Sequence, residues 1–339
     1  MRAWQFTTTT GGLEKNLKLN DAVPLPKLNP SRAELLVRVL SVSLNPADYK
    51  IPELGLVSRA VFPSPGIPCV DFCGVVVRTS SAGTKFKEGD VVFGQTDRTT
   101  CGSCAEFVVV PVGNVALLPS SEGQGIAVDE GATVSIAGLT AYQAIVPNAK
   151  AGDRVFVNGG GGGVGTFAIQ IAKALGCFVT VSCSAGKAEL CRRLGADEVV
   201  DYTACDVVGV MRGKGQVYQL CLDNVGAPEG LYKAADGFLK QDGLFCQVGA
   251  GVSMGAAGMM LSRMLVPSMF GGGKRRYQFF KIAKDAEALA QIARWIVEGK
   301  VKPVIEERFE MEDLPKAFEK LKSGRCYGKL VVHIAKGDS

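Results

Sequence analysis

The sequence predicts an α/β protein with two domains, one rich in β-strands and one built on a doubly wound parallel sheet. Three observations lead to this prediction. Short β-like runs broken by Pro and Gly fill residues 1–125, strand and helix patterns alternate from about residue 130, and β character returns after residue 299. With 339 residues the chain is long enough for two hydrophobic cores. We therefore expect residues 1–125 and 299–339 to form one domain and residues 126–298 the other.

The β-rich part contains apolar, often β-branched runs that are typical of strands. These runs are Leu35–Leu40, Val75–Arg78, Val91–Phe93 and Phe107–Val110. Gly89 and Asp90 predict a turn before the third run. The last apolar run, Lys329–Ile334, is expected to pair with this sheet, because a terminal strand most simply rejoins the first domain.

The alternating part begins with a buried strand over Arg154–Val157. A helix over residues 163–175 follows, in which Phe167, Ile171 and Leu175 recur at helical spacing. The further strands and helices expected are Phe178–Ser182, Lys187–Leu194, Glu198–Val200, Tyr218–Leu222, Leu244–Val248 and Asp285–Glu298. Alternation of this kind gives a parallel sheet with helices on both faces.

A glycine-rich loop, residues 159–165, joins the first of these strands to the first helix. Its glycines match the pattern G-x-G-x-x-G, in which glycine allows a tight turn and a close approach of the backbone to a pyrophosphate. The helix that follows directs its first N–H groups at that anion. A flexible glycine linker is the plain alternative, but the position between a strand and a helix favours a dinucleotide site. We assign to this site Gly160, Gly162, Gly163, Val164 and Gly165.

The next strand indicates which dinucleotide is bound. An NAD site usually has an Asp or Glu about 20 residues after the loop, but residues 180–186 contain no acid. They offer Ser182 and Ser184, and Lys187 follows. Hydroxyl groups and an ammonium suit a 2′-phosphate, and Tyr202 could add a phenolic donor. We therefore predict NADPH, with a solvated helix residue as the alternative interpretation of Lys187.

The sequence offers little to a metal ion. His333, the one histidine, lies in the terminal apolar run, where a structural role is the simplest interpretation. A site with two His ligands is therefore excluded, and a Ser-His triad is disfavoured. Cys101 and Cys104 have C-x-x-C spacing, but no second pair follows, and we interpret them as two incidental thiols. We predict no metal.

Composition argues against several other classes of protein. The net charge of +5 is modest, and no basic run is long enough to indicate nucleic-acid binding. No stretch reaches the roughly 18 apolar residues of a membrane span, and residues 1–10 lack the apolar run of a signal peptide. The 11 cysteines follow no disulfide spacing, so we expect a reduced, cytoplasmic protein.

The segment 249–273 contains methionines, which adapt to irregular apolar surroundings. They are Met254, Met259, Met260, Met264 and Met269. We interpret the segment as a helix in a core or at the interface of a homodimer. The alternative is a wall of the substrate pocket.

Several segments together carry a family resemblance. They are the glycine loop and residues 45–50, 65–76, 86–94, 137–143, 170–173 and 194–197. On these segments the chain resembles the medium-chain dehydrogenase/reductase superfamily, in its zinc-independent quinone oxidoreductase-like branch. The resemblance implies a GroES-like catalytic domain joined to a Rossmann domain. It also implies hydride transfer from NADPH to a quinone or to the β-carbon of an α,β-unsaturated carbonyl.

The resemblance further implies roles for single residues. Thr140 would contact the nicotinamide carboxamide, and Asn224 and Gly249 would line the ribose side. Zinc-dependent relatives carry a cysteine within the segment that corresponds to residues 45–50, and Gly-His-Glu at the position of Val70-Asp71. Both features are missing here, in agreement with the single histidine.

Without a metal, hydrogen-bond donors have to stabilise the oxygen of a developing enolate or quinol. The catalytic candidates are Asn45, Tyr49 and Lys50, and Tyr49 is also the candidate proton donor. Relatives of the chloroplast-envelope type usually carry Trp at the position of Tyr49, which puts the fit of their substrates here in doubt. A structural turn in which Asp48 caps a helix is the alternative.

Two other functions stay open at this point. A trans-acting enoyl reductase of a polyketide or fatty-acyl pathway would need a partner synthase and a groove for a thioester-borne chain. A non-catalytic NADPH-binding protein would need neither. Consumption of NADPH with a panel of quinones and enones distinguishes an enzyme from a mere binding protein.

Overall fold

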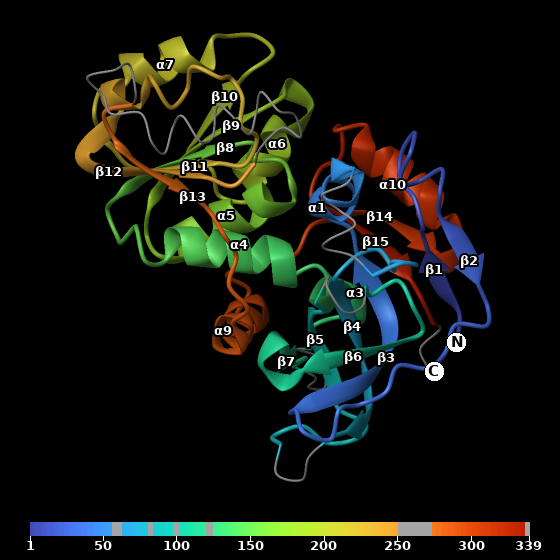
Figure 1. Ribbon diagram of the computed structural model, residues 1–339. Helices are drawn as coiled ribbons and strands as arrows, with labels where there is room; N and C mark the ends of the chain where they lie inside the picture. The colour runs from blue at the N-terminus through green and yellow to red at the C-terminus, as the bar shows by residue number, and fades with distance from the viewer. Residues whose placement is uncertain (56–62, 81–83, 98–101, 120–124, 250–272, 336–339) are drawn as a thin grey trace. The chain divides into compact units, whose positions relative to one another are not determined.

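The structure is a computed structural model that describes residues 1–339 except 56–62, 81–83, 98–101, 120–124, 250–272 and 336–339. The described chain divides into two compact units, drawn in Figure 1. The β-rich unit comprises residues 1–139, 283–299 and 303–339, and the parallel-sheet unit comprises residues 140–282 and 300–302. The predicted fold class, a parallel sheet with a separate β-rich domain, is confirmed.

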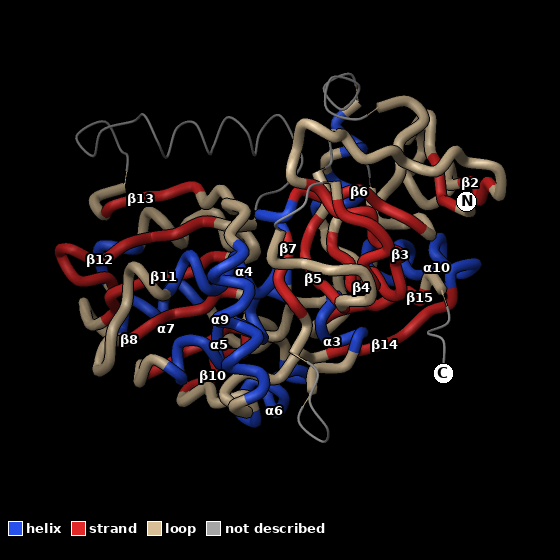
Figure 2. Tube along the Cα trace, turned by 90° about the horizontal axis from the view of Figure 1, so that it is seen from below, coloured by secondary structure: helices blue, strands red, loops and turns tan. Residues whose placement is uncertain are grey.

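A mostly antiparallel sheet forms the β-rich unit, in the order β14-β15-β3-β4-β5-β7 with β6 paired to β3. Its strands are β3 (Glu34–Ser43), β4 (Asp71–Thr79), β5 (Val91–Gln95), β6 (Phe107–Pro111), β7 (Val115–Leu117), β14 (Ile305–Glu310) and β15 (Lys329–His333), and a separate pair is β1 (Ala3–Gln5) and β2 (Lys18–Asn20). Figure 2 shows β3 among β4, β6 and β15, its three pairing partners. The terminal strand thus rejoins the first domain, as the sequence predicts.

Short helices accompany this sheet. They are α1 (Ala47–Lys50), η1 (Pro52–Leu54), η2 (Val112–Asn114), α3 (Val128–Ala132), α9 (Ala286–Val297), η5 (Met311–Asp313) and α10 (Leu314–Lys322). Helix α10 buries Leu314, Ala317 and Phe318, which share one face at helical spacing. They join a core that includes Leu35 and Phe72 of the sheet.

The parallel-sheet unit has the strand order β10-β9-β8-β11-β12-β13, and every neighbouring pair is parallel. Its strands are β8 (Arg154–Asn158), β9 (Phe178–Cys183), β10 (Glu198–Asp201), β11 (Tyr218–Asp223), β12 (Leu239–Gln247) and β13 (Arg276–Phe279). Its other elements are α5 (Gly163–Ala174), α6 (Ala185–Arg193), α7 (Val207–Gly213) and η3 (Ala235–Gly237). Figure 1 shows α5 and α7 on opposite sides of the sheet, as right-handed crossovers in both directions require.

Strand order reverses between β8 and β11, the two central strands. In open sheets of this kind, ligands bind beyond the carboxyl ends of the strands at such a reversal. The opposite end is closed by an aromatic cluster, in which Phe156, Tyr218 and Phe238 pack edge to face with ring centroids 6.1–6.3 Å apart. The topology therefore predicts a ligand site at the carboxyl ends of β8 and β11, near residues 158 and 223.

The division into units differs from the sequence-based boundaries in two places. Residues 126–139 were expected in the Rossmann domain but belong to the β-rich unit, because α3 packs against β3, β4 and β5. Residues 283–298 were also expected there, yet α9 packs against β7 of the β-rich unit. Helix α4 (Ser135–Ile145) crosses the boundary between the units. Among the described residues, no helix is long and apolar enough to cross a membrane.

Candidate functional site

The glycine-rich loop leaves β8 at Asn158 and enters α5 at Gly163, as predicted. Gly159 has a φ of +86°, a conformation that only glycine adopts readily. A Cβ on Gly165 would lie 2.2 Å from the carbonyl oxygen of Gly159, so the helix can approach the loop only with glycine there. A Cβ on Gly162, in contrast, would meet no atom closer than 3.8 Å. The open space at Gly162, next to the first N–H groups of α5, fits a pyrophosphate.

Ser182 fastens this loop to the neighbouring strand β9. Its carbonyl oxygen accepts hydrogen bonds from the N–H groups of Gly159 and Gly160, at 3.2 and 2.8 Å. Its hydroxyl donates to Asn158 Oδ1 and accepts from Gly159 N at 3.0 Å. The side chain is buried and fully used inside the protein. These contacts favour a structural role in holding the loop, and direct contact with a cofactor phosphate stays a prediction.

Lys187 lies against the same loop. A Cβ on Gly161 would come within 2.7 Å of Lys187 Cδ, so the aliphatic part of the lysine crosses the loop at this glycine. Ser184 is the N-cap residue of α6, and its carbonyl oxygen accepts from Lys187 N at 2.9 Å. Tyr202 follows β10 and exposes 58% of its surface, while its N–H donates to Cys183 O at 3.1 Å. Ser184, Lys187 and Tyr202 thus all lie near the carboxyl ends of β9 and β10.

Two polar residues that the sequence analysis did not single out lie at the reversal of strand order. Asn158 and Asp223 end β8 and β11, and Asn158 Nδ2 donates to Asp223 Oδ1 at 2.7 Å. Asn158 Nδ2 also donates to Ala227 O at 2.7 Å, and Asp223 Oδ1 accepts from Gly226 N at 2.9 Å. This network fixes the turn after β11. The available signal was positional, because each residue is the last polar residue of a central strand.

Asn224 has a feature that points to a ligand. Both polar atoms of its side chain are buried, and neither has a hydrogen-bond partner. Buried amides without partners are rare in proteins and usually mark a missing water or ligand. Gly249 lies directly beside it, since a Cβ there would be 2.0 Å from the carbonyl oxygen of Asn224. Thr140, the third residue suggested by the resemblance, is buried on α4.

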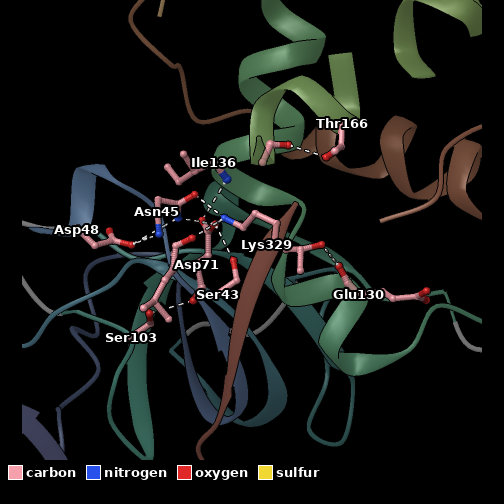
Figure 3. A network of polar contacts seen from close by, with 12 residues as sticks. Ser43, Asn45, Asp48, Asp71, Ser103, Glu130, Ile136, Thr166 and Lys329 are labelled. Atoms are coloured by element: carbon pink, nitrogen blue, oxygen red, sulfur yellow. Dashed lines mark hydrogen bonds and ion pairs between the residues drawn. The ribbon is translucent and has the colours of Figure 1, made fainter. Parts of the chain in front are cut away.

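In the β-rich unit the segment 45–50 rests on a buried polar network, shown in Figure 3. Asn45 Nδ2 donates to Asp71 Oδ2 at 2.9 Å, and Asn45 N donates to Asp48 Oδ2 at 2.7 Å. Asp71 Oδ2 also accepts from Ser43 Oγ at 3.2 Å, and Oδ1 accepts from Ile136 N at 3.0 Å. Asp71 therefore ties the segment to the start of α4.

Lys329, from β15, completes this network. Its Nζ lies 3.6 Å from Asp71 Oδ2, donates to Leu44 O at 3.0 Å and donates to Asn45 Oδ1. Both ends of the Asn45 amide are thus occupied, and only 4% of the residue is exposed. These contacts favour Asn45 as a positioning residue, so its role as a donor to substrate stays a prediction. Burial lowers the pKa of Lys329. Burial also raises the pKa of Asp71, although the positive charge of Lys329 acts in the opposite direction.

Tyr49 and Lys50 lie at the end of this segment and are only partly buried. Burial raises the pKa of Tyr49, with a further contribution from Glu53 and an opposing one from Lys322. Lys322 Nζ lies 5.4 Å from the centroid of the Tyr49 ring. Burial lowers the pKa of Lys50. The Tyr49 hydroxyl is protonated at neutral pH, as an ordinary tyrosine is, and can donate a hydrogen bond. The raised pKa makes it a weaker acid, so its role as proton donor stays a prediction.

No cluster of three or more metal-ligating side chains occurs among the residues that the structure describes. His333 Nε2 lies 3.1 Å from Asp129 Oδ2 and His333 Nδ1 lies 3.5 Å from Glu310 Oε1, so the ring is used in contacts within the protein. Cys104 is buried, and Cys101 lies outside the described residues, as do the five methionines of the segment 249–273. The absence of metal therefore stays a prediction.

Comparison with known proteins agrees with this geometry. Residues 31–120 match the model of the alcohol dehydrogenase GroES-like domain, and residues 194–332 match that of zinc-binding dehydrogenases. A trans-enoyl reductase of Aspergillus terreus is 43% identical over 98% of this chain and 96% of its own length. The chain belongs to the medium-chain dehydrogenase/reductase superfamily. The β-rich unit of this superfamily member is therefore the predicted GroES-like domain, and the predicted oxidoreductase class is confirmed.

Other relatives of this superfamily member carry related names. A 2-methylene-furan-3-one reductase of Solanum lycopersicum is 30% identical over 98% of this chain and 79% of that protein. Among solved structures, the quinone oxidoreductase of Coxiella burnetii has a TM-score of 0.83 and 26% identity and covers 99% of both chains. The similarity to a quinone oxidoreductase and to an enone reductase agrees with the branch expected from the sequence.

Proposed function

We propose that this chain is an NADPH-dependent, zinc-independent reductase that transfers a hydride to a quinone or to the C=C bond of an α,β-unsaturated carbonyl. The observation that carries the proposal is the glycine loop itself. The loop has open space at Gly162 and a lysine stem packed on Gly161, and the unpartnered amide of Asn224 lies beside it, since a Cβ on Gly159 would be 3.6 Å from Asn224 Cβ. A pyrophosphate, a 2′-phosphate and a ribose hydroxyl are the groups that these features suit.

The preference for NADPH rests on charge. The segment 180–186, at the end of β9, has no acid to hold a ribose 2′-hydroxyl. The side chain of Lys187, in contrast, packs against the glycine loop at Gly161. Asp201, at the end of β10, accepts hydrogen bonds from Thr203 N and Thr203 Oγ1 at 2.9 and 2.7 Å. Its carboxylate is thus engaged by its own turn. A 2′-phosphate beside Lys187 and Ser184 would meet an ammonium and a hydroxyl and no acid of the segment 180–186.

The cofactor, when bound, supplies the hydride. The residues of the chain then bind, orient and protonate. Asn224, Gly249 and Thr140 would hold the nicotinamide end, and Tyr49 and Lys50 would face the substrate. Tyr49 holds a proton at its hydroxyl at neutral pH, as an ordinary tyrosine does. It can donate this proton to the carbon or oxygen that becomes basic after hydride addition.

A second candidate within the same chemistry is a trans-acting enoyl reductase that works on a thioester-borne chain of a partner synthase. The 43% identity to the trans-enoyl reductase of Aspergillus terreus over nearly both full lengths favours it. The two candidates share hydride transfer to an activated C=C bond and differ in what carries the carbonyl. The third candidate is a protein that binds NADPH and catalyses no reaction.

One experiment separates these functions. Purified protein is mixed with NADPH and with quinones, small enones or acyl thioesters with a conjugated double bond, and absorbance of NADPH is followed. Turnover of enones or quinones supports the proposal, and turnover of thioesters alone supports the second candidate. Binding of NADPH with no consumption on any of the three substrate classes would refute both. NADH in place of NADPH serves as the cofactor control.

A further inference from the structure

Four polar side chains near the end of β5 are buried and have no hydrogen-bond partner. They are Gln95, Thr96, Asn114 and Ser135, through the atoms Nε2, Oγ1, Nδ2 and Oγ. Each of these residues exposes 5% of its surface or less. A single buried atom of this kind costs about 1–3 kcal/mol when it stays unsatisfied. Four in one unit are therefore an unusual concentration that calls for an occupant.

Gln95 and Ser135 lie near Asp71, and Asn114 lies near the end of β5. Gln95 is directly opposite Asp71 in the antiparallel pair of β4 and β5, so both side chains stand on the same face of the sheet. The carbonyl oxygen of Asn114 lies 2.3 Å from the position of a Cβ on Gly94, the neighbour of Gln95. Ser135 precedes Ile136, whose N–H bonds to Asp71 at 3.0 Å.

The charges in this cluster limit what it can bind. Asp71 is already matched by Lys329 at 3.6 Å and by the Asn45 amide at 2.9 Å. The unpartnered groups are neutral amides and hydroxyls, and the two amide atoms, in Gln95 and Asn114, are both donors. Neutral donors with no spare charge suit an uncharged acceptor, such as a carbonyl oxygen, better than a carboxylate or an ammonium.

We infer that Gln95, supported by Asn114, donates a hydrogen bond to the carbonyl oxygen of an α,β-unsaturated substrate. This inference rests on the proposed function and identifies the donor that oxygen stabilisation requires. The amide of Asn45, the donor expected from the sequence, is bonded to Asp71 and Lys329, whereas the Gln95 amide N–H is buried and has no hydrogen-bond partner. Negative charge that gathers on the carbonyl oxygen during hydride addition makes the Gln95 hydrogen bond stronger in the transition state.

The test is Gln95→Met, which keeps the length of the side chain and removes the donor. Because the donor has no partner in the free protein, the melting temperature should stay the same or rise. Turnover of enones should fall on the order of a hundred-fold, with the affinity for NADPH unchanged. The loss should appear in kcat more than in KM, since the bond strengthens in the transition state.

The matched control is Gln170→Met. The Gln170 amide is also buried, but its Nε2 donates to Thr166 O and Lys302 O at 2.9 and 3.0 Å. This variant should melt at a lower temperature and keep most of its turnover. The contrast shows whether the assay can separate a satisfied buried amide from an unsatisfied one.

Each other outcome counts against the inference. Turnover within about two-fold of wild type in Gln95→Met means that the amide does not contact the substrate oxygen. A lower melting temperature like that of Gln170→Met means that the Gln95 amide is part of the packing of the free protein, for instance through a buried water. If the wild-type protein oxidises NADPH in the presence of none of the three substrate classes (quinones, enones and thioesters), the proposed function itself is refuted before any variant is compared.

Discussion

Lys329 and Asp71 form a buried ion pair in the β-rich unit, with 3.6 Å between Nζ and Oδ2 and side-chain exposures of 2% and 0%. The pair joins β15, near the end of the chain, to β4 and through Asn45 to the segment that holds Tyr49. Charges buried this deeply stabilise a fold only while both partners are present. The pair therefore couples the C-terminal strand to the candidate catalytic segment.

Lys329→Met should lower the free energy of unfolding by about 3–5 kcal/mol, because Asp71 is left buried without its counter-ion. The measurement is denaturant unfolding followed by circular dichroism. The double variant Lys329→Met/Asp71→Leu should recover part of the loss, since the Asp71 carboxylate is then removed together with its counter-ion. Lys316→Met, at an exposed pair with Asp313, is the control and should change stability immeasurably. A Lys329→Met protein as stable as wild type would contradict the role of the pair.

Two glycines of the glycine-rich loop, Gly162 and Gly165, should respond differently to substitution by alanine. Gly162→Ala places its methyl group in open space and should leave the melting temperature unchanged, but it occupies the room for the pyrophosphate. We expect NADPH affinity to fall at least ten-fold, about 1.4 kcal/mol. Gly165→Ala drives a methyl group into the backbone of Gly159 and should destabilise the fold as well. Normal NADPH binding by Gly162→Ala, measured by fluorescence titration, would show that the cofactor does not lie on this loop.

Lys187 should determine the preference for NADPH. Loss of one charge-assisted contact costs about 1.5–3 kcal/mol, so Lys187→Ala should weaken NADPH binding roughly ten-fold or more and leave NADH binding almost unchanged. Isothermal titration with both cofactors measures this. Lys173→Ala is the control, because Lys173 lies in the last turn of α5, at the end away from the glycine loop. Equal affinity of the wild-type protein for the two cofactors would contradict the predicted preference for NADPH.

The pattern of hydrophobic residues predicted most of the parallel sheet, but it missed α7 and β13. Helix α7 consists of Val207–Gly213, a run with several valines and two glycines that disfavours a helix. Its start is fixed instead by Asp206, whose carboxylate accepts from Val208 N and Gly209 N. Strand β13 (Arg276–Phe279) is half polar, and only its pairing with β12 makes it a strand.

The candidate site was predicted unevenly for a similar reason. Residue type and order were enough for the glycine loop, because the chemistry there is that of the backbone. Sequence could not tell that Ser182 and Asn45 use their polar atoms inside the protein, or that Gln95 and Asn224 do not. Those differences depend on partners far along the chain, such as Asp71 and Lys329, which lie 26 and 284 residues from Asn45. Hydrogen-bond satisfaction is a property of the folded chain.

Asp129 should make stability depend on pH in the acid range. Burial alone would raise its pKa, but hydrogen bonds from Ser41, His333 and Arg308 together hold the pKa below the ordinary 3.8. A lowered folded pKa means that the carboxylate stabilises the fold above pH 3.8 and that this contribution disappears as the pH falls through the folded value. Asp129→Asn should therefore be less stable than wild type at neutral pH by about 1–3 kcal/mol, with the two converging in acid. A constant difference at every pH would contradict this account.

The hydroxyl of Tyr49 is the candidate proton donor, and its role can be tested directly. This hydroxyl is protonated over the whole neutral range, as in an ordinary tyrosine, and burial and Glu53 raise its pKa further against Lys322. Tyr49→Phe keeps the ring that packs on the core and removes only the hydroxyl, for which the described residues provide no hydrogen-bond partner. Stability and NADPH affinity should thus be unchanged.

Turnover of enones by Tyr49→Phe should fall on the order of a hundred-fold, because the proton donor is lost. Quinones should lose less, since their reduced oxygen is already a stable anion. Steady-state kinetics with both substrate classes, at matched NADPH saturation, measure the difference. Equal losses on the two classes would argue against oxygen stabilisation by Tyr49. Turnover within about two-fold of wild type, less than roughly 0.5 kcal/mol of barrier, would make Tyr49 a wall of the pocket and solvent the source of the proton.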